Sequence, residues 1–256
     1  VEDNETNLQV ARELLKLVGV DVVTARNGLE AVALVGKERF DGVLMDLQMP
    51  VMDGLTATRE IRKQASLNEL PILAMTANAM STDREDCIAA GMNDHIAKPI
   101  KPEILYRTLV QRVRPDIDLN GNIASEDSCG RTDRTLPDDL PELDGIDVLA
   151  GQESVNGDWS LYVKLIDSFR QRHRNLADKI RQAIDTGDHK SARRLAHTAK
   201  GVSGTIGAEG LTGISIQLES AIKSDGGDHI PSLLTAFSEE LRRVMDAADR
   251  LLQFED

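Results

Sequence analysis

Two groups of residues in this chain could each accept a phosphoryl group, and they use different side chains. The first centres on Asp46, within the run Val43-Leu44-Met45-Asp46-Leu47-Gln48-Met49-Pro50. The second centres on His197, within Ala196-His197-Thr198-Ala199-Lys200-Gly201. A carboxylate and an imidazole can both form covalent intermediates and then release the group. An aspartate alone suggests a switch and a histidine alone suggests a carrier, so the two together indicate a relay.

Composition limits the classes of protein that this chain could belong to. Its 256 residues are enough for two domains with separate cores, and because only 3% of residues are aromatic, those cores must be mainly aliphatic. A net charge of −13 argues against direct binding of nucleic acid. Two cysteines, Cys87 and Cys129, do not make a disulfide framework and favour a reducing compartment.

The sequence predicts no membrane contact in this segment. The longest uncharged stretch, Leu70–Thr82, has 13 residues, which is too few to span a bilayer. The amino terminus has neither a basic flank nor an apolar signal segment. We therefore expect a cytoplasmic location, with any inner-membrane anchor in an absent amino-terminal part of a parent protein.

Residues 1–113 alternate between helical and strand patterns, which indicates an α/β domain with a doubly wound, flavodoxin-like parallel sheet. Short aliphatic runs predict the strands Val20–Ala25, Gly42–Asp46, Pro71–Met75 and His95–Ala97. Amphipathic runs predict the helices Asn4–Val18, Leu29–Glu38, Leu55–Gln64, Thr82–Ala90 and Pro102–Val113.

A domain with this pattern should open with a strand before Glu2 and Asp3, yet the sequence begins at Val1. In a sheet of order 2-1-3-4-5 that strand would lie at the centre. Two explanations compete: the sequence is a fragment of a longer protein, or the domain has lost the strand. We favour the fragment.

Residues Pro115–Pro141 are predicted to be an acidic, flexible linker between two domains. The segment contains Pro, Gly, Asn and Ser without apolar periodicity, and residues 115–144 include nine acids and two arginines, a net charge of −7. The alternative is a structured loop of the first domain. The resulting domain limits are 1–114, 115–141 and 142–256.

From Leu143 onward the pattern is helical, which predicts an all-α antiparallel four-helix bundle. Asp158 can cap a long helix that runs through Ile184, and Asp188 can cap the next helix, to about Ser203. Two further helices are expected over Ala208–Ser224 and Pro231–Phe254.

The aspartate site is predicted from the residues that end successive strands. Functional groups gather at the carboxyl ends of strands in a doubly wound sheet, and here those ends carry Glu2-Asp3, Asp46, Thr76 and Lys98. Several carboxylates in one pocket repel one another unless a cation lies among them, and oxygen-only ligands favour Mg²⁺. The ammonium and the metal would offset the repulsion of an anionic donor, and the hydroxyl supplies one more hydrogen bond. The alternative is that Asp46 merely ends a strand.

These motifs closely resemble the receiver domain of two-component signalling, over about residues 1–114. The matching segments are Glu2-Asp3-Asn4, Met45–Pro50, Met75–Ala79 and Ala97–Ile100. The resemblance implies that Asp46 is phosphorylated, that Asp3, Asp46 and the backbone carbonyl of Gln48 bind Mg²⁺, and that Glu2 acts near the metal. It also implies that Thr76 and Lys98 contact the phosphoryl oxygens. The family's usual switch aromatic, three residues before the lysine, is His95 here, so an altered switch is expected.

The histidine site is predicted from the two faces of one helix. Leu195, Ala199, Val202 and Ile206 share a face suited to a core, and His197, Lys200, Gly201 and Gly204 share another. Each interior glycine costs roughly 1 kcal/mol relative to alanine, so two on the histidine's face suggest a bare docking surface. Lys200 could hold the phosphoryl group. The alternatives are a merely polar surface histidine and glycines that mark close helix packing. No acid is placed in the sequence as an obvious orienting base.

The segment around His197, followed by Thr205–Ala208, resembles the histidine phosphotransfer (HPt) domain over about residues 143–254. That resemblance implies an exposed His197 that exchanges phosphate with receiver domains. The order of the two domains resembles the carboxyl-terminal half of a tripartite hybrid sensor histidine kinase.

We therefore predict a phosphorelay in which a histidine kinase domain of the same parent donates to Asp46, Asp46 to His197, and His197 to a downstream response regulator. The linker has an expected span of roughly 30 Å, which permits transfer within one molecule. No Gly-rich phosphate loop is present, so the chain is expected to be a phosphotransfer intermediate without its own ATP-binding domain. Two rival classes are an aspartyl phosphatase, disfavoured because position 48 is Gln, and a non-phosphorylated adaptor that retains both folds.

Overall fold

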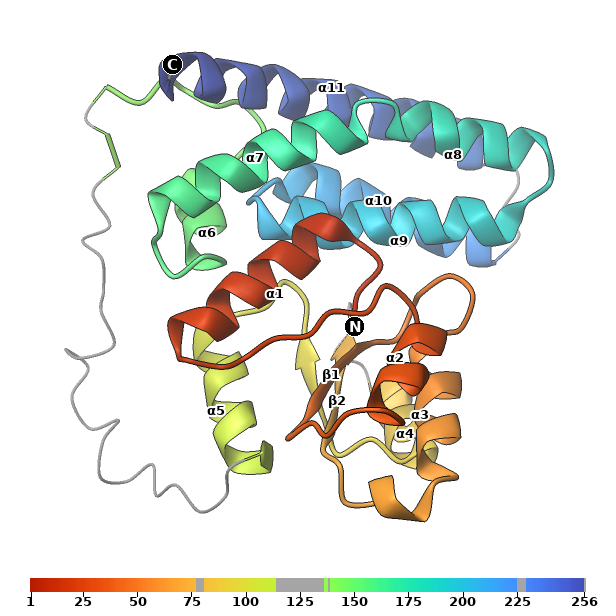
Figure 1. Cartoon of the computed structure of the whole chain (residues 1–256). Coiled ribbons are helices and arrows are strands. Elements are labelled where there is room, and N and C mark those ends of the chain that lie inside the picture. The colour runs from red at the N-terminus through yellow and green to blue at the C-terminus, as the bar shows by residue number, and fades with distance from the viewer. Residues whose placement is uncertain (77–80, 114–135, 138, 225–228, 256) are drawn as a thin grey trace. The chain divides into compact units, whose positions relative to one another are not determined.

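The computed structural model describes residues 1–76, 81–113, 136–137, 139–224 and 229–255 (Figure 1). The chain divides into two compact units, Val1–Arg131 and Thr132–Asp256, and each is described by itself. Most of the predicted linker Pro115–Pro141 lies outside the described residues.

The first unit is built on a parallel sheet whose described strands are β1 (Val43–Asp46), β2 (Ile72–Thr76) and β3 (Asp94–Ala97), in the order β1-β2-β3. Asp46 is paired with Met75, and Thr76 with Ala97, so the three strands end at the same edge. All five residues of β2 are buried, which is typical of a strand covered on both faces. The predicted doubly wound fold is confirmed.

Helices cover both faces of this sheet. Figure 1 shows α1 (Glu5–Leu17) and α5 (Pro102–Val113) on one side, and α2 (Gly28–Val35), α3 (Gly54–Arg62) and α4 (Ser81–Ala90) on the other. A short 3₁₀ turn, η1, spans Ala65–Leu67. Side chains of Asn4, Asn27 and Asp53 accept hydrogen bonds from backbone amides in the first turns of α1, α2 and α3. The five predicted helices are therefore present, with ends shifted by up to three residues.

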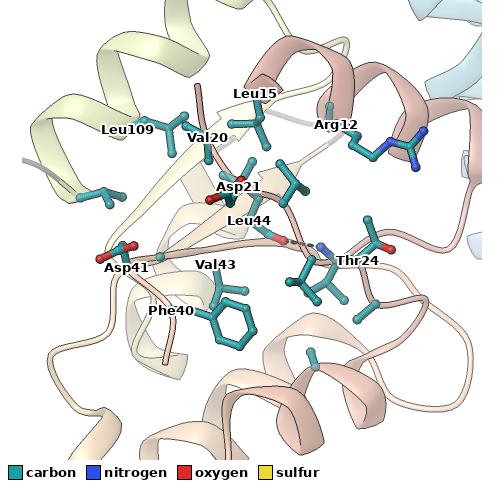
Figure 2. Close-up of a pocket in the computed structure, with 18 of the residues that line it drawn as sticks. Arg12, Leu15, Val20, Asp21, Thr24, Phe40, Asp41, Val43, Leu44 and Leu109 are labelled. Carbon is teal, nitrogen blue, oxygen red and sulfur yellow. Dashed lines mark hydrogen bonds between the residues drawn. The ribbon is translucent and has the colours of Figure 1, made fainter. Parts of the chain in front are cut away.

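The predicted strand Val20–Ala25 is wrong, because these residues do not form a regular strand. In the described part of the chain, this segment pairs with the sheet through Glu2, whose amide donates to the Ala25 carbonyl at 3.0 Å. Val1 lies between this segment and β1. Its amino group donates to the Leu44 carbonyl at 2.7 Å (Figure 2), and its own carbonyl accepts from the Asp46 amide at 3.0 Å. Val1 and Glu2 thus occupy the central position expected for the opening strand.

Arg62, at the end of α3, hydrogen-bonds several chain segments at the edge of the sheet opposite Asp46. Its guanidinium donates to the carbonyls of Gly91, Leu67 and Leu70 at 2.9, 2.6 and 2.8 Å, and to Asn93 Oδ1 at 3.0 Å. Leu70 and Asn93 lie just before β2 and β3.

The second unit is the predicted helical bundle, with two corrections. The predicted helix from Asp158 to Ile184 is two helices, α7 (Trp159–His173) and α8 (Leu176–Asp185), because the chain turns at Arg174 and Asn175. A short helix that was not predicted, α6 (Val148–Glu153), precedes them. The remaining helices are α9 (His189–Thr205), α10 (Glu209–Lys223) and α11 (Ile230–Glu255).

The core of this unit is formed by apolar side chains that are fully removed from solvent, among them Tyr162, Leu165, Phe169, Val202, Ile206 and Phe237. Asp158 and Asp188 cap α7 and α9, as predicted. Within the described residues of both units, no helix combines the length and the apolar character that crossing a bilayer would need.

Candidate functional site

The polar residues predicted at the strand ends come together in the first unit. Asp46 ends β1, Thr76 ends β2, and Lys98 follows β3 directly, with its backbone amide donating to the Thr76 carbonyl at 2.7 Å. Glu2 and Asp3 come from the segment before α1. Asp46 and Thr76 are each 3% exposed and Glu2 is 2% exposed, so all three residues are buried.

Lys98 joins two of the acids directly. Its ammonium lies 2.6 Å from Glu2 Oε2 and 2.8 Å from Asp46 Oδ2. Burial alone would lower the pKa of Lys98, but the charges of Glu2 and Asp46 and their hydrogen bonds raise it above its ordinary value. Lys98 therefore remains a cation beside the Asp46 carboxylate over the physiological pH range.

Glu2 behaves differently from an ordinary surface acid. Burial raises the pKa of Glu2 to about 7, against the opposing effect of Lys98 and with a further increase from Asp46. Asn7 Nδ2 also donates to Glu2 Oε1 at 3.2 Å. The carboxylates of this pocket are thus close enough to affect one another's ionisation.

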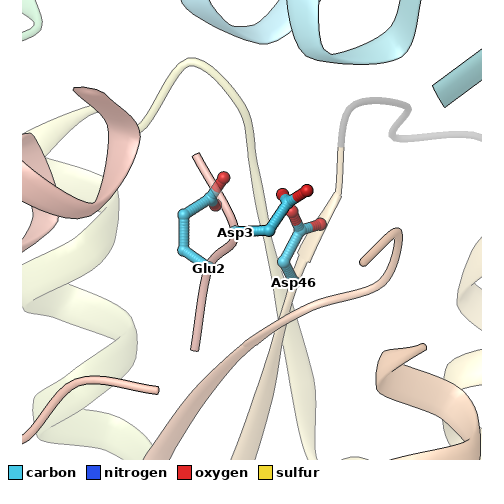
Figure 3. Close-up of side chains that lie close together, drawn as sticks. All are labelled: Glu2, Asp3 and Asp46. Atoms are coloured by element: carbon cyan, nitrogen blue, oxygen red, sulfur yellow. The ribbon is translucent and has the colours of Figure 1, made fainter. Parts of the chain in front are cut away.

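Glu2, Asp3 and Asp46 form a cluster of oxygen ligands. Each offers a carboxylate oxygen, and these atoms lie within 4.8 Å of one another, at one end of the sheet (Figure 3). Three acids beside a single lysine carry excess negative charge, and a set of oxygen donors alone matches a hard divalent cation such as Mg²⁺. The donor set therefore fits the predicted metal.

The chain after Asp46 is shaped by close backbone contacts. The Gln48 amide donates to Asp46 Oδ1 at 3.2 Å, and the Gly54 amide donates to the Leu47 carbonyl at 3.1 Å. A Cβ at position 54 would overlap the backbone carbonyl of Asp46, so only glycine lets α3 begin this close to Asp46.

The remaining receiver-side prediction concerns the switch position. His95 lies within β3, is half-buried, and has its ring Nδ1 at 3.6 Å from Asp94 Oδ1. In the sequence, His95 is three residues before Lys98. An altered switch at this position stays a prediction.

His197 lies in the middle of α9, but the expected exposure of its imidazole is wrong. The residue is 9% exposed. Its Nδ1 lies 3.1 Å from Glu219 Oε1 on α10. A neutral imidazole that donates from Nδ1 has its lone pair on Nε2, which is the ring nitrogen able to attack phosphorus.

Glu219 is the functional candidate that the sequence did not reveal. Burial would raise the pKa of Glu219, but the hydrogen bond from His197 and the nearby Lys200 and Arg193 lower it overall. The Arg193 guanidinium Nε lies 3.8 Å from the same carboxylate oxygen. Glu219 is 22 residues from His197 on the next helix, so no local pattern could identify it.

The other residues predicted around His197 are less exposed than expected. Lys200 is 7% exposed, Gly201 is buried, and Gly204 is half-buried. On the expected core face, Ala199, Val202 and Ile206 are fully buried, which confirms that part of the prediction, whereas Leu195 is only half-buried.

Comparison with known families assigns a domain to each unit. Residues 1–110 match the response regulator receiver domain, and residues 164–251 match the Hpt domain. Both predicted resemblances are thereby confirmed.

Relatives carry the same two regions within longer proteins. Sensor protein EvgS of Escherichia coli K12 is 28% identical over 245 residues, which are 95% of this chain and 18% of EvgS. The aerobic respiration control sensor protein ArcB of the same strain is 26% identical over 247 residues, which are 96% of this chain and 30% of ArcB. This chain thus spans less than a third of either relative.

Among solved structures, the receiver domain of sensor histidine kinase PA1611 from Pseudomonas aeruginosa PAO1 is 45% identical, covering 44% of this chain and 93% of that one, with a TM-score of 0.42. That receiver domain has a magnesium ion coordinated in its active site cleft.

Proposed function

Because this chain joins a receiver domain to an Hpt domain and belongs to phosphorelay signalling, we propose that Asp46 and His197 are its two successive phosphoryl acceptors. An upstream phosphohistidine donates to Asp46, Asp46 donates to His197, and His197 donates to the receiver domain of a separate response regulator. The observation that carries this proposal is the Lys98 ammonium, 2.8 Å from Asp46 Oδ2 beside a three-acid cluster.

In the first step, an Asp46 carboxylate oxygen attacks phosphorus and the N–P bond of the donor imidazole breaks. The attacking carboxylate and the incoming phosphoryl group are both anionic, so the step needs positive charge at the site. Lys98 supplies one such charge and can move from the Asp46 carboxylate to a phosphoryl oxygen. Thr76 supplies a hydroxyl from the next strand end.

A magnesium ion fits the same pocket. Asp3, Asp46 and the backbone carbonyl of Gln48 would hold it, with Glu2 beside it. When bound, Mg²⁺ supplies the further charge neutralisation that phosphoryl transfer requires.

In the second step, His197 Nε2 attacks the phosphorus of the acyl phosphate and the Asp46 carboxylate leaves. Glu219 supports this step by accepting a hydrogen bond from the Nδ1–H of His197, with Nδ1 and Oε1 3.1 Å apart, which leaves the lone pair on Nε2. Lys200 stabilises the phosphoryl group on the imidazole, and Gly201 and Gly204 leave room for the receiver domain that docks there.

We further propose that the domains are residues 1–114 and 142–256, joined by the acidic segment 115–141. The donor would be a histidine kinase domain of the same parent protein, and both domains would act in the cytoplasm. The match to long sensor proteins supports this arrangement.

Radiolabelling tests the proposal. The intact chain, Asp46→Asn and His197→Gln are incubated with a labelled phospho-donor protein and Mg²⁺. We expect acid-stable, base-labile label at Asp46 in the His197→Gln chain and no label in Asp46→Asn. The intact chain should also carry acid-labile label at His197. Label at neither residue in the intact chain would reject the relay.

Mixing the two variants separates transfer within a chain from transfer between chains. If Asp46 and His197 exchange only within one molecule, the mixture forms no phosphohistidine. Phosphohistidine on the Asp46→Asn chain in this mixture would show transfer between molecules.

A further inference from the structure

Arg193, a cation in the second unit, faces the same acid that is hydrogen-bonded to His197. Helices α9 and α10 lie side by side in this unit (Figure 1). Arg193 precedes His197 by four residues, so the two side chains share one face of α9, and Glu219 reaches both from α10. Glu219 Oε1 lies 3.1 Å from His197 Nδ1 and 3.8 Å from Arg193 Nε. One carboxylate oxygen is therefore shared by the imidazole and the guanidinium.

This group of three side chains is set largely inside the helical bundle. The side chains of His197 and Glu219 are 11% and 13% exposed. The Arg193 side chain is 38% exposed overall, but its Nε is buried and has no hydrogen-bond partner in the described part of the chain. A buried N–H without a hydrogen bond costs free energy, so the attraction between the Arg193 charge and Glu219 has to offset that cost.

Glu219 brings both an advantage and a difficulty to phosphoryl transfer. An ionised carboxylate only accepts hydrogen bonds, so its contact with Nδ1 leaves the lone pair of a neutral imidazole on Nε2. The same negative charge repels the phosphoryl group that Nε2 must reach, and the repulsion is stronger away from solvent. An acid that orients the imidazole therefore needs positive charge beside it.

Two cations on α9 act on the charge of Glu219. Burial raises the pKa of Glu219, whereas the hydrogen bond from His197 and the charges of His197, Lys200 and Arg193 lower it overall. In the proposed relay, Lys200 contacts the phosphoryl group. Arg193 is then the cation that remains beside Glu219 during transfer.

We propose that Arg193 is a positioning residue for transfer through His197: it balances the charge of Glu219, so that Glu219 can orient the imidazole without repelling the incoming phosphoryl group. This inference rests on the proposed function of His197 and adds a residue to it. Arg193 acts through Glu219 and not on the reacting atoms. A guanidinium suits this task, because it is always charged and is more weakly hydrated than an ammonium group.

A double-mutant cycle on the intact chain tests this proposal. Single-turnover labelling with the phospho-donor protein follows label as it leaves Asp46 and arrives at His197, which measures the second step by itself. Arg193→Gln should slow this step about fivefold to tenfold, because the unbalanced charge of Glu219 opposes the phosphoryl group. In a chain that already carries Glu219→Gln, adding Arg193→Gln should change the rate by less than about twofold.

Two further variants separate the charge of Arg193 from its packing. Arg193→Lys keeps the positive charge and should restore at least about half of the lost rate. Arg242→Gln removes an arginine on α11 whose side chain is 74% exposed, and it should leave the rate unchanged. Nitrogen chemical shifts of the unphosphorylated imidazole should be the same in Arg193→Gln as in the intact chain, because Glu219 still accepts from Nδ1.

Three results would overturn the proposal. They are an unchanged rate in Arg193→Gln, equal slowing by Arg193→Gln with and without the Glu219 carboxylate, and a changed balance of imidazole tautomers in Arg193→Gln. The last result would show that Arg193 only places Glu219. All three are observed on chains that still accept label, whereas label at neither Asp46 nor His197 would reject the proposed function itself.

Discussion

The two proposed acceptor sites differ in how their charged groups are assembled. Around Asp46, the groups come from separate strand ends and from the segment before α1, and their positions depend on the whole sheet. Around His197, they come from two adjacent helices, with His197, Lys200 and Arg193 on α9 and Glu219 on α10. The receiver pocket combines a cluster of three acids that fits a divalent cation with a buried lysine, whereas the Hpt site has one imidazole hydrogen-bonded to one acid. We infer that most of the catalytic stabilisation lies on the receiver side.

Removal of divalent cations should separate the two sites most strongly. With a chelator present, labelling of Asp46 should be abolished, because Lys98 alone cannot offset the combined negative charge of the acids and the phosphoryl group. The rate at which His197 loses label already attached to it should be the same with and without the chelator, because the cluster of three acids lies in the receiver unit. Label is measured on each residue before and after Mg²⁺ is restored. Equal loss at both sites would contradict the comparison.

Lys98→Ala should lower the rate of transfer to Asp46 by about 100- to 1000-fold, the usual effect of deleting one preorganised electrostatic group. Lys101→Ala, in an exposed residue three positions later, is the matched control and should leave the rate unchanged. Single-turnover labelling measures both. A loss of less than threefold in Lys98→Ala would show that this cation is dispensable.

Acid should destabilise the Hpt unit through His173. Burial lowers the pKa of His173 to about 4, although the Phe169 carbonyl bonded to its ring opposes that change. The unfolded chain therefore binds this proton at higher pH than the folded chain does. The neutral ring contributes at most about 3 kcal/mol to the free energy of unfolding. This contribution is complete above pH 6.5 and is lost as pH falls toward 4.

Fluorescence of Trp159, the chain's single tryptophan, follows unfolding of this unit in denaturant. His173→Gln should remove most of the pH dependence of the free energy of unfolding between pH 6.5 and 4. His189→Gln, at an exposed position, should leave that dependence unchanged. If the free energy of unfolding changes equally with pH in the unsubstituted chain and in both variants, the acid sensitivity comes from other groups.

Glu219→Gln should have the smallest effect, about a tenfold slower transfer through His197, because one hydrogen bond to a charged group is weakened. Nitrogen chemical shifts of the imidazole should also show a changed balance between the Nδ1 and Nε2 protonated forms. Glu209→Gln, exposed at the start of the same helix, is the control. An unchanged tautomer in Glu219→Gln would remove the positioning role.

The sequence predicted the receiver pocket better than the Hpt site, for a physical reason. Parallel strands bring their carboxyl ends to one edge, so Asp46, Thr76 and Lys98 could be placed together without coordinates. A helix face gives no comparable information about its neighbour. Glu219 therefore escaped prediction, and the near-complete burial of His197 was not foreseen.

Local signals also explain the errors in the fold. The apolar period of α7 continues into α8 across Arg174 and Asn175, and neither residue is a strong helix breaker, so one helix was predicted where two exist. Helix α6 is short and contains Gly151, which usually disfavours helix. A Cβ there would overlap the ring of Tyr162 and the Ile206 carbonyl, so packing requires the glycine. Val20–Ala25 has strand composition, and in the described part of the chain Ala25 accepts a hydrogen bond from the Glu2 amide without forming a regular strand.

Arg62 has a consequence for how this receiver unit can tolerate sequence change. One planar guanidinium with several N–H donors fixes the separation of the chain segments that enter β2 and β3. A lysine at this position could supply the positive charge, but its single ammonium group could not make the same four hydrogen bonds in different directions. Neutral drift should therefore be freer on the solvent side of α3 than at this arginine, although Arg62 lies at the far edge of the sheet from the chemistry.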